Sequence, residues 1–180
     1  MNPDLRLAQS CISQIADYPV PGVVFKDVTP IAADAEAFAS VLRAIEDHYA
    51  NKGVTHIVGI EARGFIFGAA LAARMNLGFI PIRKSGKLPR KTHRVEYALE
   101  YGNDAIEIHT DALKSGDVVL VIDDVLATGG TACAALDLIT QCNAQALALV
   151  VLLNLEFLGG NQLVKNSYAE VEILTVFPDA

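Results

Sequence analysis

Unbroken aliphatic runs alternate with helix-like segments along most of the chain, and this alternation constrains the fold more than any other feature. Strands buried on both faces appear as continuous apolar runs, and the helices between them cover both faces of a parallel sheet. We therefore expect an α/β fold with a mainly parallel central sheet flanked by helices. Strands are predicted over residues 55–60, 78–82, 105–109, 117–122, 146–154 and 171–177, and helices over 3–16, 34–51, 63–76 and 131–142.

The composition limits the class of protein. With 180 residues, 52% of them hydrophobic, the chain suits a single domain over 1–180 with a substantial core. No segment reaches the roughly 18 continuous apolar residues of a membrane span, and no basic-then-apolar leader opens the chain, so we expect a cytoplasmic protein without a membrane partner. The three cysteines form no CxxC pair and the four histidines have no metal-binding spacing, which argues against a disulfide framework or a zinc site.

One basic segment stands out from the acidic whole. The net charge of −7 disfavours nucleic acid as a partner, yet residues 83–94 hold six of the 14 lysines and arginines and no acid. Such a run is either a solvated loop or a cover for an anion. The connection from Arg83 to about Asp104 spans roughly 20 residues, where about 4–6 is usual. We therefore predict a flexible lid loop over 83–103.

The segment that carries the most chemistry is VLVIDDVLATGGT, residues 119–131. Asp123 and Asp124 follow a strong strand, and in open α/β sheets ligands bind beyond the carboxyl ends of the strands. The small residues after them expose successive N–H groups ahead of a helix, with the hydroxyls of Thr128 and Thr131 as further donors. That arrangement is typical of a phosphate cradle.

The two acids need a different partner, because a carboxylate repels a phosphate. They are suited to accepting hydrogen bonds from sugar hydroxyls, or to holding a divalent cation directly or through water. Together with the cradle they predict a site for a phosphorylated sugar. The alternative is that Asp123 and Asp124 only cap the following turn.

Two other phosphate motifs are excluded. No GxGxxG sequence occurs among the 13 glycines, which argues against a dinucleotide site. Gly59 and Gly64 have the spacing of a P-loop, but Phe65 and Ile66 stand where that motif needs Lys and Ser or Thr.

Five motifs in order resemble those of a known enzyme family. The segment VVLVIDDVLATGGT is similar to the 5-phosphoribosyl 1-diphosphate-binding motif of type I phosphoribosyltransferases. Four more segments extend the resemblance to the adenine phosphoribosyltransferase family along nearly the whole chain: YPVPGVVFKDVTP to its base-binding segment, GIEARGFIFG to its diphosphate-binding turn, and IRKSGKLP and YALEYG to the start and end of its mobile loop.

The resemblance implies the type I phosphoribosyltransferase fold, with an N-terminal helix and base-binding segment over 1–33 and the mobile loop over 83–103. It implies a pentosyltransferase of purine salvage, in which adenine displaces diphosphate from C1 of 5-phosphoribosyl 1-diphosphate to give AMP. The ribosyl centre passes through an oxocarbenium-like state. Mg²⁺ is the expected cofactor, held mainly by substrate with no residue assigned as its ligand, and a homodimer is the expected assembly.

The resemblance also assigns roles by motif. Asp123 and Asp124 would hold the ribose hydroxyls, and Glu100, on the closing loop, would lie near the base, where proton transfer is proposed. The 5′-phosphate would be wrapped by Ala127, Thr128, Gly129, Gly130 and Thr131. The diphosphate would be bound by Arg63, Arg83, Lys84 and Lys87. The adenine would be held by Phe25, Val125 and the backbone around Lys26, with Tyr101 helping to close the loop.

Several of these residues have a simpler alternative. Phe25 on its own fits core packing, Glu100 fits a solvated surface, and Arg63 fits the start of a helix, although a cation there is locally unfavourable. Lys26 stands where the family more often has arginine, which removes bidentate contacts. Arg90, Lys91 and Arg94 receive no individual role.

Two rival functions remain open at this point. One is a sister transferase for hypoxanthine or xanthine, whose family usually holds the 6-oxo purine with side chains not found here. The other is a transcription regulator that keeps the fold and binds 5-phosphoribosyl 1-diphosphate only as an effector. Only about 50 residues, which are not basic, precede the first core strand, and this favours an enzyme over a regulator.

Overall fold

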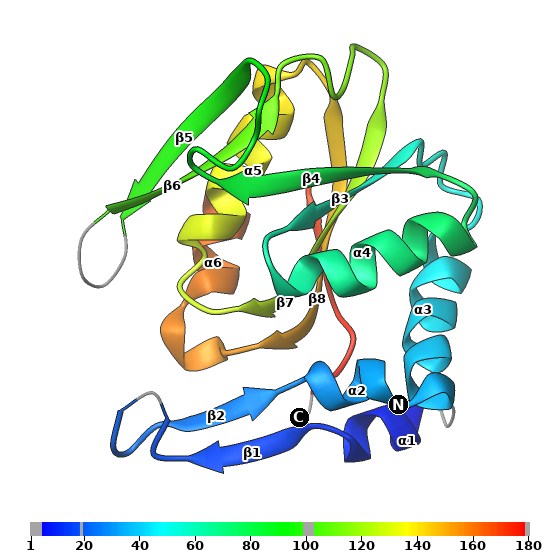
Figure 1. Cartoon of the computed structure of the whole chain (residues 1–180), viewed down its shortest axis with the longest axis vertical. Coiled ribbons are helices and arrows are strands. Elements are labelled where there is room, and N and C mark those ends of the chain that lie inside the picture. Colours follow the sequence, from blue (N-terminus) through cyan, green and yellow to red (C-terminus); the bar gives the residue numbers. More distant parts are fainter. Residues whose placement is uncertain (1–4, 19, 99–102, 179–180) are drawn as a thin grey trace.

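A seven-stranded sheet forms the centre of the molecule. The computed structural model describes residues 5–18, 20–98 and 103–178, and Figure 1 shows the sheet with helices on both sides. The strand order is β5-β6-β4-β3-β7-β8-β9. The strands are β3 (His56–Ile60), β4 (Gly78–Lys84), β5 (Thr92–Ala98), β6 (Asn103–His109), β7 (Val118–Leu126), β8 (Gln145–Asn154) and β9 (Glu172–Thr175).

The sheet is parallel from β4 through β3, β7 and β8 to β9, and antiparallel only where β6 joins β4 and β5. The predicted α/β class and the mainly parallel sheet are therefore confirmed. Successive side chains of a strand point to opposite faces, so each face needs its own apolar cover. On β7, Leu120 and Ile122 enter one hydrophobic cluster, whereas Val119 and Val121 enter the other.

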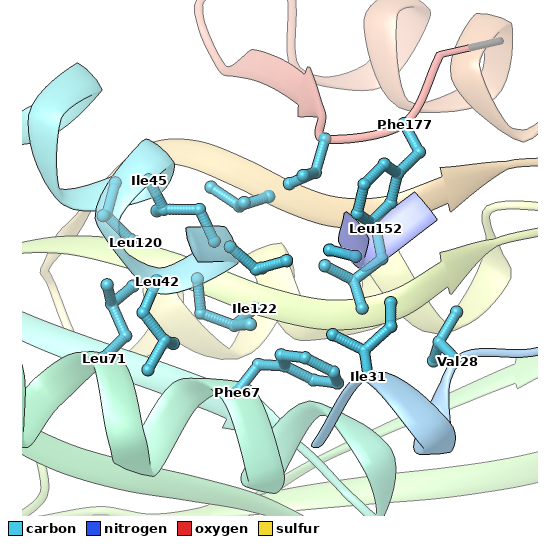
Figure 2. Packing of buried hydrophobic residues seen from close by; sticks show 14 of the residues in the cluster. Val28, Ile31, Leu42, Ile45, Phe67, Leu71, Leu120, Ile122, Leu152 and Phe177 are labelled. Carbon is cyan, nitrogen blue, oxygen red and sulfur yellow. The ribbon is translucent and has the colours of Figure 1, made fainter. Parts of the chain in front are cut away.

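Helices supply the cover on each face. The first face is covered by α1 (Arg6–Ser10), α2 (Thr29–Ala33), α3 (Ala35–Tyr49) and α4 (Arg63–Arg74), and the second by α5 (Gly130–Gln141) and α6 (Gly160–Ser167). Figure 2 shows the first cluster, where Leu42, Ile45, Phe67 and Leu71 of α3 and α4 lie against Ile122 of β7 and its neighbours. Fully burying such a side chain contributes about 1.5–3 kcal/mol.

Local sequence sets the start of α3. Asp34 is extended, and its Oδ1 accepts hydrogen bonds from the N–H groups of Glu36, at 3.0 Å, and Ala37, at 2.9 Å. This N-cap satisfies two donors that a helix start leaves unpaired. Val41 and Ile45 then lie one turn apart and are buried against the sheet.

The predicted helix over 3–16 is wrong in its second half. Helix α1 ends at Ser10, and β1 (Ser13–Ala16) pairs antiparallel with β2 (Val24–Asp27). The apolar residues at 12 and 15 have a helical spacing. However, the backbone of residues 13–16 forms its hydrogen bonds with β2, the strand that follows the Pro- and Gly-containing turn. This β1–β2 hairpin lies beyond the carboxyl ends of β7 and β8 in Figure 1.

The expectation of an irregular connection over 83–103 also needs correction. Residues Thr92–Ala98 form β5, which pairs with β6 from Thr92 opposite His109 to Ala98 opposite Asn103. Arg94 and Glu96 are exposed, whereas Val95 and Tyr97 are half-buried. This alternation is that of an edge strand whose charged side chains face water. The density of basic residues obscured the pattern in the sequence.

The second half of the chain contains two elements that the sequence did not predict. A short 3₁₀ helix, η2 (Glu156–Leu158), follows β8 and leads into α6.

Within the described ranges, no helix is long and apolar enough to cross a bilayer.

Candidate active site

The position of the site follows from the order of the strands. β3 and β7 are parallel neighbours, but the chain leaves β3 through α4 on one face and β7 through α5 on the other. A crevice opens where two connections diverge in this way, outside the carboxyl ends of the strands. Arg63, the first residue of α4, forms an ion pair with Asp124 of β7 at this point.

Asp123 and Asp124 lie inside β7, because the strand continues to Leu126 and does not end before them as predicted. Asp124 is only 5% exposed, and its Oδ2 accepts a hydrogen bond from Arg63 Nε. The Oδ1 atom of Asp123 accepts from the backbone N–H of Asp124 at 2.9 Å. Burial, followed by the charge of Asp124, raises the pKa of Asp123 well above its usual value.

The predicted phosphate cradle turns directly from β7 into α5. Gly129 has a φ of +87°, which lets the chain turn sharply, and α5 begins at Gly130. The first N–H groups of a helix lack intrahelical partners and carry the positive end of its dipole. A small cavity of about 70 Å³ is lined by Asp123, Val125, Leu126, Ala127, Thr128, Gly129, Thr131, Ala132, Leu149 and Val151. Five of the predicted sugar-phosphate residues thus share one hollow.

Arg63, on α4, contacts both β2 and β7. Its guanidinium carbon lies 5.7 Å from the centre of the Phe25 ring, and its Nε donates to Asp124. Burial would lower the pKa of Arg63, but the hydrogen bond and charge of Asp124, with Asp123 nearby, raise it. The peptide bond that precedes Ala62, in the turn before Arg63, is cis.

The other predicted diphosphate cations, Arg83, Lys84 and Lys87, lie on β4 and the turn after it. Arg83 Nη2 is 3.2 Å from Glu61 Oε1, and its Nη1 donates to the carbonyl of Lys87 at 3.1 Å. Partial burial would raise the pKa of Glu61, but hydrogen bonds from the Lys84 N–H and the Arg83 guanidinium lower it. Arg83 and Lys84 are the last two residues of β4, so they belong to the sheet and not to a loop.

Lys84 has its own carboxylate partner, which the sequence did not predict. Its Nζ is 3.0 Å from Asp104 Oδ2, and Tyr97 Oη donates to the same oxygen at 3.4 Å. The hydrogen bond to Asp104 raises the pKa of Lys84, and the same bond lowers the pKa of Asp104. Tyr97 and Asp104 are paired across β5 and β6, so a correct strand prediction would have revealed both.

The outer basic residues face acids at the surface. Arg90 is 2.6 Å from Asp111, and Arg94 is 2.9 Å from Glu96, with all four side chains exposed. Exposed pairs of this kind contribute about 0–1 kcal/mol to stability. They give Arg90 and Arg94 no specific place in the site.

The site has a polar and an apolar part. A cavity of about 470 Å³ is lined by Phe25, Ile60, Glu61, Ala62, Arg63, Lys84, Tyr97, Asp104, Asp123, Asp124, Val125, Ala127, Thr131 and Leu155. An adjoining groove of about 330 Å³ is lined by Val20, Val23, Val24, Phe25, Lys26, Val125, Leu155, Phe157 and Leu158. The two share Phe25, Val125 and Leu155.

The predicted base-binding residues come together here. Phe25 and Val125 lie at the junction of cavity and groove, and Lys26 lines the groove. Leu155 and Phe157, which complete the apolar wall, were missed, because only the fold brings the η2 turn across to the hairpin. Of the predicted diphosphate cations, Arg63 and Lys84 line the cavity, whereas the described wall includes neither Arg83 nor Lys87.

Glu100 and Tyr101 lie outside the described residues. Within the described part of the chain, no group of three or more His, Cys, Asp or Glu side chains could hold a metal ion. Mg²⁺, however, is commonly bound through one or two carboxylates together with substrate phosphates and waters. Asp123 and Asp124 provide hard oxygen donors of that kind, so the residues fit a substrate-held Mg²⁺.

The fold and the crevice with its phosphate cradle define a phosphoribosyltransferase. A family model described as a phosphoribosyl transferase domain matches residues 27–175, and the chain belongs to this family.

Relatives narrow the class further. Adenine phosphoribosyltransferase from Streptomyces clavuligerus is 52% identical over 169 residues, which cover 94% of this chain and 95% of that protein. The structure of adenine phosphoribosyltransferase from Saccharomyces cerevisiae, complexed with adenine and an imino-altritol bisphosphate, is 32% identical with a TM-score of 0.90, covering 98% of this chain and 99% of that one. The Trypanosoma brucei enzyme, in complex with AMP, pyrophosphate and ribose-5-phosphate, is 27% identical with a TM-score of 0.88, covering 97% and 78%. Within its family, the chain therefore belongs with the adenine phosphoribosyltransferases.

Proposed function

We propose that the protein converts adenine and 5-phosphoribosyl 1-diphosphate to AMP and diphosphate, as an enzyme of purine salvage. The observation that carries this proposal is the junction of the two hollows: an apolar groove meets a charged cavity at Phe25 and Val125, next to the phosphate cradle. A flat base fits the apolar part and a sugar phosphate fits the polar part. The relatives from S. cerevisiae and T. brucei bind ligands of both kinds.

The sugar phosphate occupies the end of β7 in this proposal. The 5′-phosphate accepts hydrogen bonds from the N–H groups of Ala127–Thr131 and from the hydroxyls of Thr128 and Thr131. The ribose hydroxyls donate to Asp123 and Asp124. Each acid is already held by a neighbour, Asp123 by a backbone N–H and Asp124 by Arg63, so both are oriented before the sugar arrives.

The diphosphate leaving group is bound by the cations across the crevice. Arg63 and Lys84 bind it from the cavity wall, the Arg83 side chain reaches it from β4, and Lys87 closes over it from the turn after β4. Each of the first two has a carboxylate partner in the free protein, Asp124 and Asp104 respectively. Binding therefore exchanges carboxylates for phosphate oxygens without leaving a cation unpaired. Mg²⁺, when bound with the substrate, would add positive charge that helps to neutralise the diphosphate.

The adenine stacks between Phe25 and Val125, and the backbone around Lys26 reads its edge. The motif resemblance adds Glu100, near the base where a proton is transferred, and Tyr101, which helps to close the loop over the substrates. Closure excludes water from the activated sugar. A lid limited to the parts of 83–103 that lie outside β4 and β5, the base-binding segment over 1–33, a homodimer and a cytoplasmic location are parts of the same proposal.

One assay separates this function from its rivals. Purified protein with Mg²⁺ and 5-phosphoribosyl 1-diphosphate is offered adenine, hypoxanthine, xanthine and guanine in turn, and diphosphate release is followed. We expect turnover with adenine alone. Turnover only with a 6-oxo purine would identify a sister transferase, and tight binding of the sugar diphosphate without turnover would indicate a regulator.

A further inference from the structure

The turn after β8 lies directly against the phosphate cradle. The N–H of Leu155 donates to the carbonyl of Leu126 at 2.9 Å, and the N–H of Gly160 donates to the carbonyl of Ala127 at 3.1 Å. Helix α6, which begins at Gly160, is the neighbour of α5 (Figure 1). The cradle is therefore supported from behind by the turn after β8 and by the start of α6, a helix that has no role in the proposed reaction.

The contact is made glycine to glycine. A Cβ atom at Gly160 would lie 2.2 Å from the carbonyl oxygen of Ala127 and 2.8 Å from the backbone nitrogen of Gly129. A Cβ atom at Gly129 would lie 2.9 Å from the carbonyl oxygen of Gly160. All of these neighbours are backbone atoms, which cannot move aside as the end of a side chain can.

Conformational freedom does not explain the glycine at 160. It is the first residue of α6, a position that other residues occupy readily. The adjacent Gly159 is the opposite case: its φ of +72° favours glycine, and an added Cβ would meet nothing within 4 Å. Gly160 is thus required for close approach, whereas Gly159 is required for backbone conformation.

We propose that Gly160 is a positioning residue for the 5′-phosphate. By contacting Ala127 and Gly129 from behind, it fixes where the N–H groups of the cradle point. This inference rests on the proposed function, which places the phosphate there. Hydrogen bonds from N–H to oxygen need about 2.7–3.2 Å, so even a small displacement of the cradle weakens them.

The test compares two adjacent alanine substitutions. For Gly160→Ala we expect the Kd of ribose 5-phosphate, measured by calorimetry, and the KM for 5-phosphoribosyl 1-diphosphate to rise about 10- to 100-fold, the loss expected for a displacement near 1 Å. The KM for adenine should change less than about twofold, because Gly160 contacts the cradle and does not line the groove for the base. Gly159→Ala should lower Tm through backbone strain and leave all three constants near the wild-type values.

The proposal would be overturned if Gly160→Ala left the sugar-phosphate constants unchanged. It would also be overturned if Gly159→Ala weakened sugar-phosphate binding as much as Gly160→Ala does. A uniform fall in kcat with unchanged KM values would also contradict it, because that indicates only a smaller folded fraction. The proposed function fails separately, if the wild-type protein does not turn over adenine.

A measurement on the wild-type protein covers the case in which Gly160→Ala does not fold. Hydrogen exchange of the Gly160 amide, which is bonded to Ala127, should slow when ribose 5-phosphate binds. The Thr55 amide, bonded to Val118 at the amino ends of β3 and β7, serves as the control and should not respond. An unchanged Gly160 amide in the saturated protein would overturn the inference.

Discussion

The charged residues of the site neutralise one another in the free protein. Arg63 pairs with Asp124, Arg83 with Glu61, and Lys84 with Asp104. Asp123 differs, because its hydrogen-bond partner is a backbone N–H and a second acid lies beside it; burial and the charge of Asp124 outweigh the nearby charge of Arg63 and disfavour the charged form of its carboxylate. A function that needs this carboxylate explains why the chain retains such an unfavourable group.

Asp123→Asn should therefore make the protein more stable and less active. An amide at 123 keeps an oxygen for the N–H of Asp124 but carries no charge to desolvate. Activity should fall about tenfold or more, because a charge-assisted hydrogen bond to the ribose contributes about 1.5–3 kcal/mol. Steady-state kinetics and thermal unfolding of both proteins measure the two effects.

The pH dependence of this stability difference has a definite sign. The folded-state pKa of Asp123 is raised, so wild-type stability from this group is present below the unfolded pKa of about 3.9 and is lost as pH rises towards the folded pKa. The Tm advantage of Asp123→Asn should be near zero at about pH 3–4 and grow towards neutral pH. A constant advantage across this range would contradict the assignment.

At the scale of elements, the β1–β2 hairpin brings the predicted base-binding residues Phe25 and Lys26 to the site. Ile15 pairs with Phe25 in the register of the hairpin, and the Phe25 ring contacts Tyr18 with centroids 5.2 Å apart. Phe25 lines both the cavity and the groove, whereas Ile15 lines neither. A change in the hairpin should therefore affect the proposed binding of the base and leave the proposed binding of the phosphate unaffected.

Phe25→Ala should raise the KM for adenine about tenfold, since an aromatic stack contributes about 0.5–1.5 kcal/mol beyond its buried area. The KM for 5-phosphoribosyl 1-diphosphate should stay near the wild-type value, because the groups proposed to bind it lie on α4, on β4 and the turn after it, on β7 and at the turn into α5. Ile15→Ala is the matched control for disturbing the hairpin. If Ile15→Ala raised the KM for adenine equally, the effect would belong to the hairpin as a whole and not to the Phe25 ring.

The sequence predicted the elements with local signals and missed those that depend on distant partners. The strand over 117–122 and the helix over 34–51 carry their own apolar pattern, and both elements are present, although the strand continues to Leu126. Residues 13–16 and 92–98 became strands only because β2 and β6 supply their hydrogen-bond partners. Helix α6 was missed because its sequence, GNQLVKNS, has few apolar residues to show a helical period.

At the scale of the whole molecule, strand order assembles the site. The predicted phosphate residues, 127–131, are contiguous and carry a motif, and they lie together at the turn from β7 into α5. Asp104, Leu155 and Phe157 carry no such motif and reach the crevice through β6 and the turn after β8. The family membership and the enzyme class were predicted correctly, whereas the outer walls of the site required the fold.

The central claim is that ribose 5-phosphate binds at the carboxyl end of β7 with the base against Phe25. A crystal structure of the protein with AMP tests it directly. We expect the phosphoryl oxygens within about 2.7–3.2 Å of the N–H groups of residues 127–131, the ribose hydroxyls on Asp123 and Asp124, and the purine between Phe25 and Val125. A phosphoryl group bound elsewhere, with this crevice empty, would contradict the account.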